Sequence, residues 1–200
     1  IVFTSDHGDY LGDHWMGEKE LFHDVSVKIP LIIFDPRKEA DQSRGTECNE
    51  LVEAIDLLPT FIEANDLKIP NARLEGKSLM SIISNSQSKP LRDYVFSEFD
   101  YGIYQVREKL KVNINDAKIF MIRDKNWKFV YYKGFDPQLF DLQNDPEEFL
   151  DLGKSQKHKG IIEGMKEKLF QRLINRRNRI SISDEAYSIM RDDENEKGII

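Results

Sequence analysis

An aspartate and a histidine stand next to each other near the start of the chain, as Asp6 and His7. A carboxylate oxygen and an imidazole nitrogen suit a divalent cation, because oxygen satisfies hard ions and nitrogen favours manganese, zinc or iron. An Asp-His dipeptide alone is more often part of a surface turn than of a metal site. The pair is therefore a metal-site candidate only if its neighbours supply related chemistry.

Two further side chains of suitable types follow in the same loop. Lys19 is long enough to bring an ammonium group to an anionic substrate, and His14 lies between it and the Asp-His pair. When hydrolysis builds negative charge on oxygen atoms, a cation and an ammonium group aimed at those atoms lower the barrier. A lysine in a polar loop is commonly a solvated surface residue, so both interpretations of Lys19 stand at this point.

The elements that would position these residues are two strand-like runs. Residues 2–4 form a short apolar run that ends at the polar loop, and residues 29–34, flanked by prolines, predict a buried strand. In open α/β sheets, ligands gather at the carboxyl ends of strands. We therefore expect the Asp-His pair at a strand end, facing a site lined by loops.

Periodic patterns further along the chain predict helices and a small antiparallel sheet. Apolar residues at spacings of three and four favour amphipathic helices at 49–67, where Pro59 should kink or divide the helix, and at 159–176. A short helix is expected at 74–83, and strands are expected at 94–99, 120–123, 127–132 and 138–142. Turn residues at 124–126 should join the second and third of these strands into a hairpin.

Three stretches around the candidate residues follow one another in a characteristic order. They are Thr-Ser-Asp-His-Gly-Asp-Tyr-Leu-Gly-Asp-His at 4–14, Gly-Glu-Lys at 17–19 and Ser-Val-Lys-Ile-Pro-Leu-Ile at 26–32. In order and spacing they resemble the second conserved block of the sulfatase family within the alkaline phosphatase superfamily. The resemblance implies that Asp6 and His7 ligate the active-site metal. It also implies that Lys19, supported by His14, binds the sulfuryl or phosphoryl oxygens of the substrate and assists catalysis.

Later motifs extend the resemblance over nearly the whole chain. The stretches at 92–98, 134–140 and 183–186 look closer to bacterial phosphonate monoester hydrolases than to typical sulfatases. One residue departs from the pattern, because His23 stands where many relatives have an aromatic residue. This departure puts the shape of one pocket wall in doubt.

The resemblance implies an α/β fold of the alkaline-phosphatase-like sandwich type. Residues 1–90 would form the C-terminal portion of the catalytic domain, residues 91–180 a small subdomain of antiparallel sheet and helix, and residues 181–200 an extended C-terminal arm. The chain starts in a strand-like run without an initiator methionine, so we expect a fragment. The family's nucleophile, a cysteine or serine converted to formylglycine, would lie upstream, and Cys48 in its acidic surroundings does not replace it.

The function that follows is a metal-dependent hydrolase of phosphonate, phosphate or sulfate esters, inactive as an isolated fragment. The expected cofactor is one divalent ion: manganese, zinc or iron, with calcium as the alternative. Two other functions stay open. One is an arylsulfatase-type sulfuric ester hydrolase, and the other is a noncatalytic binding or assembly module that keeps the fold.

Composition bounds the partners. A formal net charge of −7 without a basic run disfavours nucleic acid, and no apolar run is long enough to cross a membrane. The partner is then a small anionic ester, together with a second copy bound through the C-terminal arm. The single cysteine fits the cytoplasm, with the periplasm as the alternative if a signal peptide precedes the chain.

Overall fold

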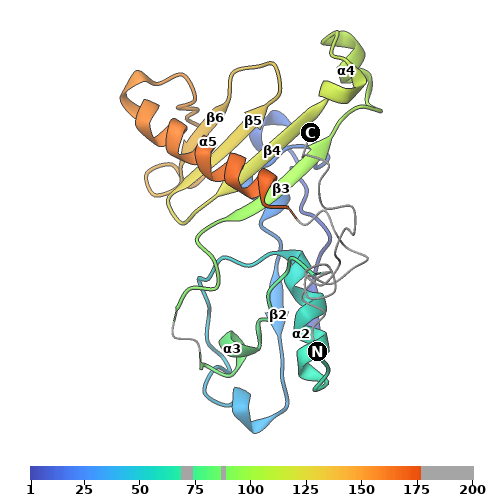
Figure 1. The fold of residues 1–200 in the computed structure, drawn as a ribbon, viewed down its shortest axis with the longest axis vertical. Coiled ribbons are helices and arrows are strands. Elements are labelled where there is room, and N and C mark those ends of the chain that lie inside the picture. Colours follow the sequence, from blue (N-terminus) through green and yellow to red (C-terminus); the bar gives the residue numbers. More distant parts are fainter. Residues whose placement is uncertain (69–73, 87–88, 177–200) are drawn as a thin grey trace, which may run out of the picture.

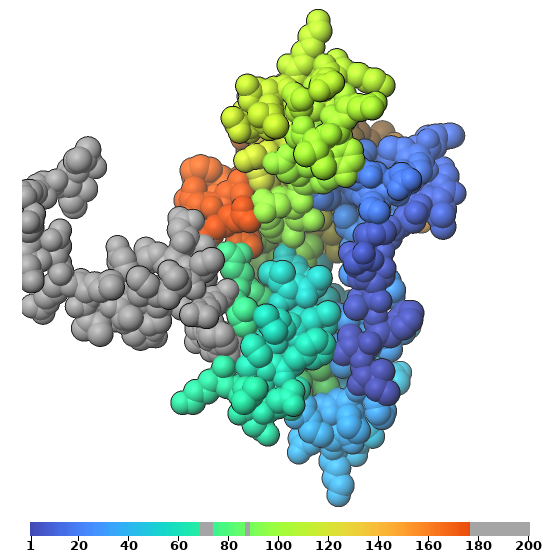
Figure 2. Space-filling view, turned by 90° about the vertical axis from the view of Figure 1, so that its right-hand side faces the viewer, coloured from blue at the N-terminus to red at the C-terminus, as the bar shows by residue number. Residues whose placement is uncertain are grey.

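The structure is a computed structural model that describes residues 1–68, 74–86 and 89–176. It is a mixed α/β arrangement with two regions (Figure 1). A four-stranded sheet crossed by a long helix forms the sheet region, and a two-stranded ribbon with two short helices forms the ribbon region. Figure 2 shows the two regions from the side, with α2 in teal beside the dark blue N-terminal strand.

The sheet region is antiparallel throughout, in the order β3-β4-β5-β6. Its strands are β3 (Val95–Asp100), β4 (Lys118–Arg123), β5 (Trp127–Tyr132) and β6 (Gln138–Asp141). The predicted hairpin is confirmed, and Asp124 Oδ1 closes its turn by accepting the backbone N–H groups of Asn126 and Trp127. The alternation at 94–99 and the turn residues between the next two apolar runs therefore predicted these strands correctly.

Both faces of this sheet are covered. On one face, α5 (Lys159–Ile174) buries Met165 and Leu169 against Ile122, Phe129 and Leu139. The predicted second amphipathic helix is thus confirmed. On the other face, the core consists of Phe22, Tyr101, Ala117, Ile119, Met121 and Val130, so a segment near the N-terminus supplies part of the cover.

Short helical turns connect these strands. The helix α4 (Gln105–Lys109) follows β3 and was not predicted, because its polar sequence carries no apolar periodicity. The single-turn 3₁₀ segments are Asp13–Trp15, Lys38–Ala40, Ala54–Asp56, Ile114–Asp116 and Gln156–His158.

The ribbon region pairs β1 (Val2–Thr4) antiparallel with β2 (Leu31–Ile33). Both strands were predicted, but the expectation of a buried strand at 29–34 is wrong for this chain. Ile32 is 63% exposed and Phe34 is 49% exposed. Within the described residues Ile32 pairs with Phe3, which is 62% exposed, so the face on which these two side chains lie has no covering layer.

The helix predicted at 49–67 is shorter than expected and is not kinked by its proline. It is α2 (Leu57–Ala64), and Pro59 lies in its first turn, where a missing N–H leaves no helical hydrogen bond unmade. Leu58 and Phe61, two of the apolar residues on the predicted helix, are 53% and 46% exposed. The stretch predicted at 74–83 contains only one helical turn, α3 (Met80–Ile83).

A buried ion pair joins the two regions. Arg92, just before β3, donates two hydrogen bonds of 2.5 Å to the carboxylate of Asp56, at the start of α2. The Asp56 side chain is 0% exposed, and Glu53 accepts the backbone N–H of Phe96 at 2.7 Å. These contacts fix the ribbon region to the edge of the sheet.

The predicted C-terminal arm at 181–200 lies outside the described residues. The divisions near residues 90 and 180 also remain predictions, although the change from ribbon to sheet falls between α3 and β3. Within the described residues, no helix has the length and apolar character needed to cross a membrane.

Candidate functional site

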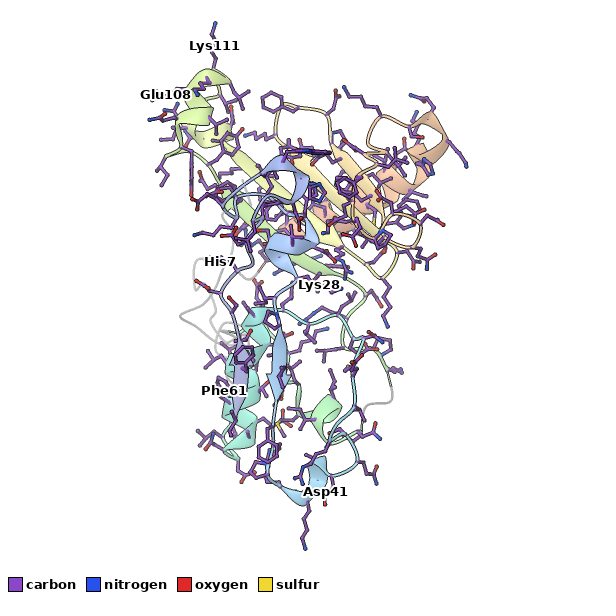
Figure 3. All side chains as sticks on the ribbon, turned by 180° about the vertical axis from the view of Figure 1, so that it is seen from behind. His7, Lys28, Asp41, Phe61, Glu108 and Lys111 are labelled. Carbon is purple, nitrogen blue, oxygen red and sulfur yellow. The ribbon has the colours of Figure 1, made fainter. Side chains whose placement is uncertain are left out.

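The Asp-His pair directly follows β1, as predicted, where the chain leaves the ribbon (Figure 3). His7 Nδ1 lies 2.7 Å from the carbonyl oxygen of Gly8. A carbonyl can only accept, so Nδ1 carries the proton and Nε2 of the neutral ring keeps a free lone pair. This Nε2 lies 3.5 Å from Asp6 Oδ2, so a nitrogen and an oxygen donor lie side by side.

The surroundings of Asp6 favour its ionised carboxylate form. A hydrogen bond with its own backbone amide, and next the electrostatic influence of the neighbouring His7, lower the pKa of this carboxyl below its ordinary value. Its Oδ1 also accepts the backbone N–H of His7 at 3.1 Å. The side chain is 86% exposed, against 41% for His7, so both donors are open to an approaching ion.

The two donors fit part of a metal site. A backbone carbonyl that orients a ligating imidazole through its second nitrogen is the usual support for a histidine ligand. A divalent ion needs at least four ligands, however, and no cluster of three or more His, Cys, Asp or Glu residues occurs in the part of the chain that the structure describes. The remaining ligands of such a site would have to come from elsewhere.

Lys19 lies at the end of a loop that folds back on the Asp-His segment. The backbone N–H of Tyr10 donates to Glu18 O at 2.9 Å, and that of Gly12 donates to Met16 O at the same distance. The carbonyl of Lys19 accepts the Ser26 hydroxyl at 2.7 Å, while its side chain is exposed. The structure thus brings the backbone of Lys19 back beside the residues that follow His7.

This loop is conformationally strained. Four of its non-glycine residues have positive φ angles: Leu11 at 46°, His14 at 52°, Trp15 at 57° and Glu18 at 63°. L-residues adopt this region at a cost, and such residues concentrate at functional sites where the surroundings enforce them. The strain therefore supports this loop as a site element.

His14, predicted to support substrate binding, is held between two rings. It stacks on His23 at 4.0 Å between ring centroids and on Phe149 at 4.8 Å. Phe149 follows β6, so the C-terminal part of the chain sets the position of this imidazole. Whether His14 contacts a substrate stays a prediction.

His23 occupies the place where an aromatic residue was expected, and it packs as one. Its Nδ1 lies 2.7 Å from the hydroxyl of Tyr10, which is 1% exposed. Burial, and next the nearby His14 and Lys128, lower the pKa of His23 to about 4, so the ring is neutral and accepts the Tyr10 proton. Burial raises the pKa of Tyr10 to about 12.

Sequence reasoning missed a buried charged cluster behind the site. Lys128, on β5, is 0% exposed and donates to Phe22 O at 2.8 Å and to Asp24 Oδ1 at 2.5 Å. Its Nζ also lies 2.6 Å from Glu148 Oε1, in an ion pair without the geometry of a hydrogen bond. A lysine between apolar neighbours on a strand is the only signal that the sequence offered.

The two carboxyls of this cluster are shifted in opposite directions. Burial alone would raise the pKa of Asp24, but Lys128 and then Arg123 lower it below its ordinary value. For Glu148, burial outweighs Lys128 and raises the pKa. Asp24 is therefore the carboxylate that is more readily ionised beside the buried ammonium group of Lys128.

Cys48 is free and exposed and takes no part in either site.

Comparison with known proteins places these residues in a family. Residues 12–175 match the sequence profile of a family described as N-sulphoglucosamine sulphohydrolase, C-terminal. The multifunctional alkaline phosphatase superfamily protein PehA of Trinickia caryophylli is 34% identical over 76% of this chain and 30% of its own length. An arylsulfatase of Clostridium perfringens is 30% identical over 86% of this chain and 33% of its own length.

A solved structure also matches this chain in fold and in sequence. The phosphonate monoester hydrolase of Agrobacterium radiobacter superposes with a TM-score of 0.77 at 32% identity, over 86% of this chain and 34% of that protein. The chain thus spans about a third of the length of the relatives that it matches.

Proposed function

Since this chain belongs to the sulfatase family of the alkaline phosphatase superfamily, we propose that it is part of a metal-dependent hydrolase of anionic phosphonate, phosphate or sulfate esters. Residues 1–90 then complete a larger α/β sandwich, and residues 91–180 form a smaller subdomain beside it. The exposed apolar face of the ribbon fits this role, because a sheet needs a covering layer on each apolar face.

The observation that carries the proposal is the proximity of Asp6 Oδ2 and His7 Nε2, 3.5 Å apart, with His7 Nδ1 hydrogen-bonded to the Gly8 carbonyl. Manganese, zinc or iron accept such a mixed oxygen and nitrogen pair, and calcium favours oxygen alone. When bound, the ion supplies positive charge to the oxygens of the ester.

The residues of this chain would divide the remaining work. Asp6 and His7 hold the ion, and Lys19 extends its ammonium group toward the nonbridging oxygens of the substrate. Negative charge grows on those oxygens during hydrolysis, so removing one such donor costs about 3 kcal/mol of transition-state stabilisation. In this proposal the nucleophile and the other metal ligands come from the part of the relatives' length that this chain does not cover, about two thirds.

The test is a metal titration and a turnover assay on the complete protein that carries this chain. Asp6→Ala and His7→Ala should each weaken manganese binding strongly, whereas Asp41→Ala, at the far tip of the ribbon region (Figure 3), should not. Unchanged metal affinity in both site variants would overturn the proposal and favour a noncatalytic module.

Lys19 can be tested against a matched lysine in the same region. Lys19→Ala should lower kcat/KM by roughly 100-fold, the equivalent of about 3 kcal/mol. Lys28→Ala should leave kcat/KM nearly unchanged, because Lys28 makes only a 3.9 Å ion pair with Asp24 and its side chain is 72% exposed. Equal effects of the two variants would exclude the proposed role of Lys19.

The isolated 200-residue chain should be inactive. Two metal ligands without a nucleophile cannot complete the reaction, so hydrolysis of an aryl phosphonate by this chain alone would contradict the division of work proposed above. The measurement is release of the aryl alcohol at saturating manganese.

An arylsulfatase-type activity is the second candidate, because the Clostridium perfringens arylsulfatase is 30% identical over 86% of this chain. Matched aryl phosphonate and aryl sulfate substrates on the complete protein separate the two. A higher kcat/KM for the sulfate, together with bound calcium, would narrow the proposal to the arylsulfatase-type activity, and a higher kcat/KM for the phosphonate would exclude that activity as the main one.

A further inference from the structure

The short helix α1 (Asp24–Val27) touches three parts of the molecule that lie apart in the sequence. We propose that α1 positions the Asp-His pair and Lys19 relative to each other, and that Lys128 and Glu148 fix α1 on the four-stranded sheet. This inference rests on the proposed function for its catalytic consequence. All the contacts that support this inference lie between residues that the structure describes.

The first contact lies next to His7. The backbone N–H of Gly8 donates to the carbonyl of Ser26 at 2.7 Å. A Cβ atom on Gly8 would lie 2.0 Å from the carbonyl oxygen of Val25, a backbone atom that cannot move aside without moving the helix. Only glycine allows this approach. The carbonyl of the same Gly8 orients the His7 ring, so α1 also sets the direction of the histidine nitrogen.

The second contact holds the Lys19 segment. The Ser26 hydroxyl donates to the carbonyl of Lys19 at 2.7 Å, and Ser26 is 2% exposed. One buried residue thus holds the metal-pair segment through its carbonyl and the lysine segment through its hydroxyl. The separation between the cation and the ammonium group would then depend on Ser26.

The third contact anchors the helix itself. The backbone N–H of Asp24, at the start of α1, donates to Glu148 Oε2 at 2.6 Å. The Asp24 carboxylate accepts the buried ammonium group of Lys128 at 2.5 Å. Both partners belong to the sheet region and lie more than a hundred residues away in sequence, with separations of 124 and 104. The C-terminal sheet is therefore connected to the site through α1.

Ser26 and Gly8 offer a selective test, because each holds a different half of the site. In the complete protein, Gly8→Ala should raise the dissociation constant of manganese by roughly 10- to 100-fold, the range for residues that orient metal ligands. Ser26→Ala keeps the carbonyl that holds Gly8 and removes only the hydroxyl. It should raise KM for the ester or lower kcat by roughly tenfold, and leave manganese affinity within about twofold.

The anchor is tested without metal on the 200-residue chain. Glu148→Gln keeps an oxygen acceptor for Asp24 but removes the negative charge beside Lys128. We expect amide hydrogen exchange at Gly8 to become roughly tenfold faster, because the contacts that hold α1 weaken. Glu98→Gln removes a carboxylate paired with Arg176 at 2.7 Å on the surface, and it should leave exchange at Gly8 unchanged.

The outcomes separate the inference from the function on which it rests. A wild-type protein without metal binding or turnover overturns the proposed function, while exchange at Gly8 in Glu148→Gln still tests the anchor. Ser26→Ala and Gly8→Ala with the same loss of metal affinity would overturn the selective positioning. Exchange at Gly8 unaffected by Glu148→Gln would overturn the anchor. If Glu148→Gln does not fold, Lys128→Met combined with Glu148→Met removes both charges, and the same acceleration is expected.

Discussion

The sheet region and the ribbon region both contain apolar strands but differ in how much of their apolar surface is covered. In the sheet region, α5 covers one face and the segment around Phe22 and Val27 covers the other. In the ribbon region, the strand register pairs Phe3 with Ile32, and both are more than 60% exposed, at 62% and 63%. Alternation along a strand therefore predicts a face, but a second layer decides whether that face is buried.

The largest difference should appear on removing a core ring from the sheet region. Phe129→Ala deletes a side chain that is 0% exposed and packs beneath α5. Loss of apolar transfer and the remaining cavity should lower the free energy of unfolding by about 4 kcal/mol. Urea denaturation of the 200-residue chain measures this. A loss below about 1 kcal/mol would show that this core is looser than the structure indicates.

The connection between the two regions should come next. Arg92→Leu leaves the Asp56 carboxylate buried without its guanidinium partner. Breaking a buried pair by removing one partner should lower the free energy of unfolding by about 3 kcal/mol. Arg44→Leu removes an exposed pair with Asp41 and two exposed hydrogen bonds to the carbonyls of Asp35 and Arg37, and it should cost less than Arg92→Leu in the same denaturation assay. Similar losses in both variants would mean that the Arg92 pair is solvated.

The stability of the chain should depend on pH through His23, which lies where the site loop meets the sheet region. The pKa of His23 is about 4 in the folded chain, below the ordinary 6.5, so the unfolded state takes up a proton first as the pH falls. The stability due to neutral His23 is present above about 6.5 and is lost as the pH falls toward about 4. His23→Gln should flatten this part of the profile in thermal denaturation. An equally steep loss in that variant would assign it to other groups.

The smallest effect is expected on the open face of the ribbon. Phe3→Ala removes a ring that is already mostly exposed, so the free energy of unfolding of the 200-residue chain should change by no more than about 0.5 kcal/mol. The same denaturation assay measures it. A loss approaching that of Phe129→Ala would mean that another surface covers the ribbon in solution.

Local patterns predicted most strands and the long helix. The errors concern features that a local pattern does not contain, such as contacts with distant residues and the residue at which an element begins. Residues 127–132 are mostly apolar and aromatic and form β5 as predicted, but this composition gives no reason to expect Lys128 inside. Its burial depends on Asp24, which lies 104 residues away. Pro59 was likewise expected to kink or divide the helix, because the predicted helix began at residue 49 and placed the proline in its interior. α2 begins at Leu57, so Pro59 lies in the first turn, where a proline is tolerated.

The candidate site also contains residues whose roles the sequence predicted and one whose role it did not. The types of Asp6, His7 and Lys19 suggested their chemistry, and the position of the pair directly after β1 agrees with the expectation. Ser26 opens one of the stretches that carry the family resemblance, but its role could not be predicted, because a serine in an apolar stretch suggests neither a ligand nor a charge. Its importance comes from two hydrogen bonds to segments that only the folded chain brings together.

The two-stranded ribbon also bears on the colloidal behaviour of the chain. Within the described residues, the outer edges of β1 and β2 have no strand partner, and such edges favour association between molecules. Mutual repulsion opposes this at pH 7, where the net charge is −7, and it vanishes near the isoelectric point of about 5.2. Preparations of this chain should therefore scatter light most strongly in mildly acidic buffer, and added arginine or glutamate side chains along β2 should shift or suppress that maximum.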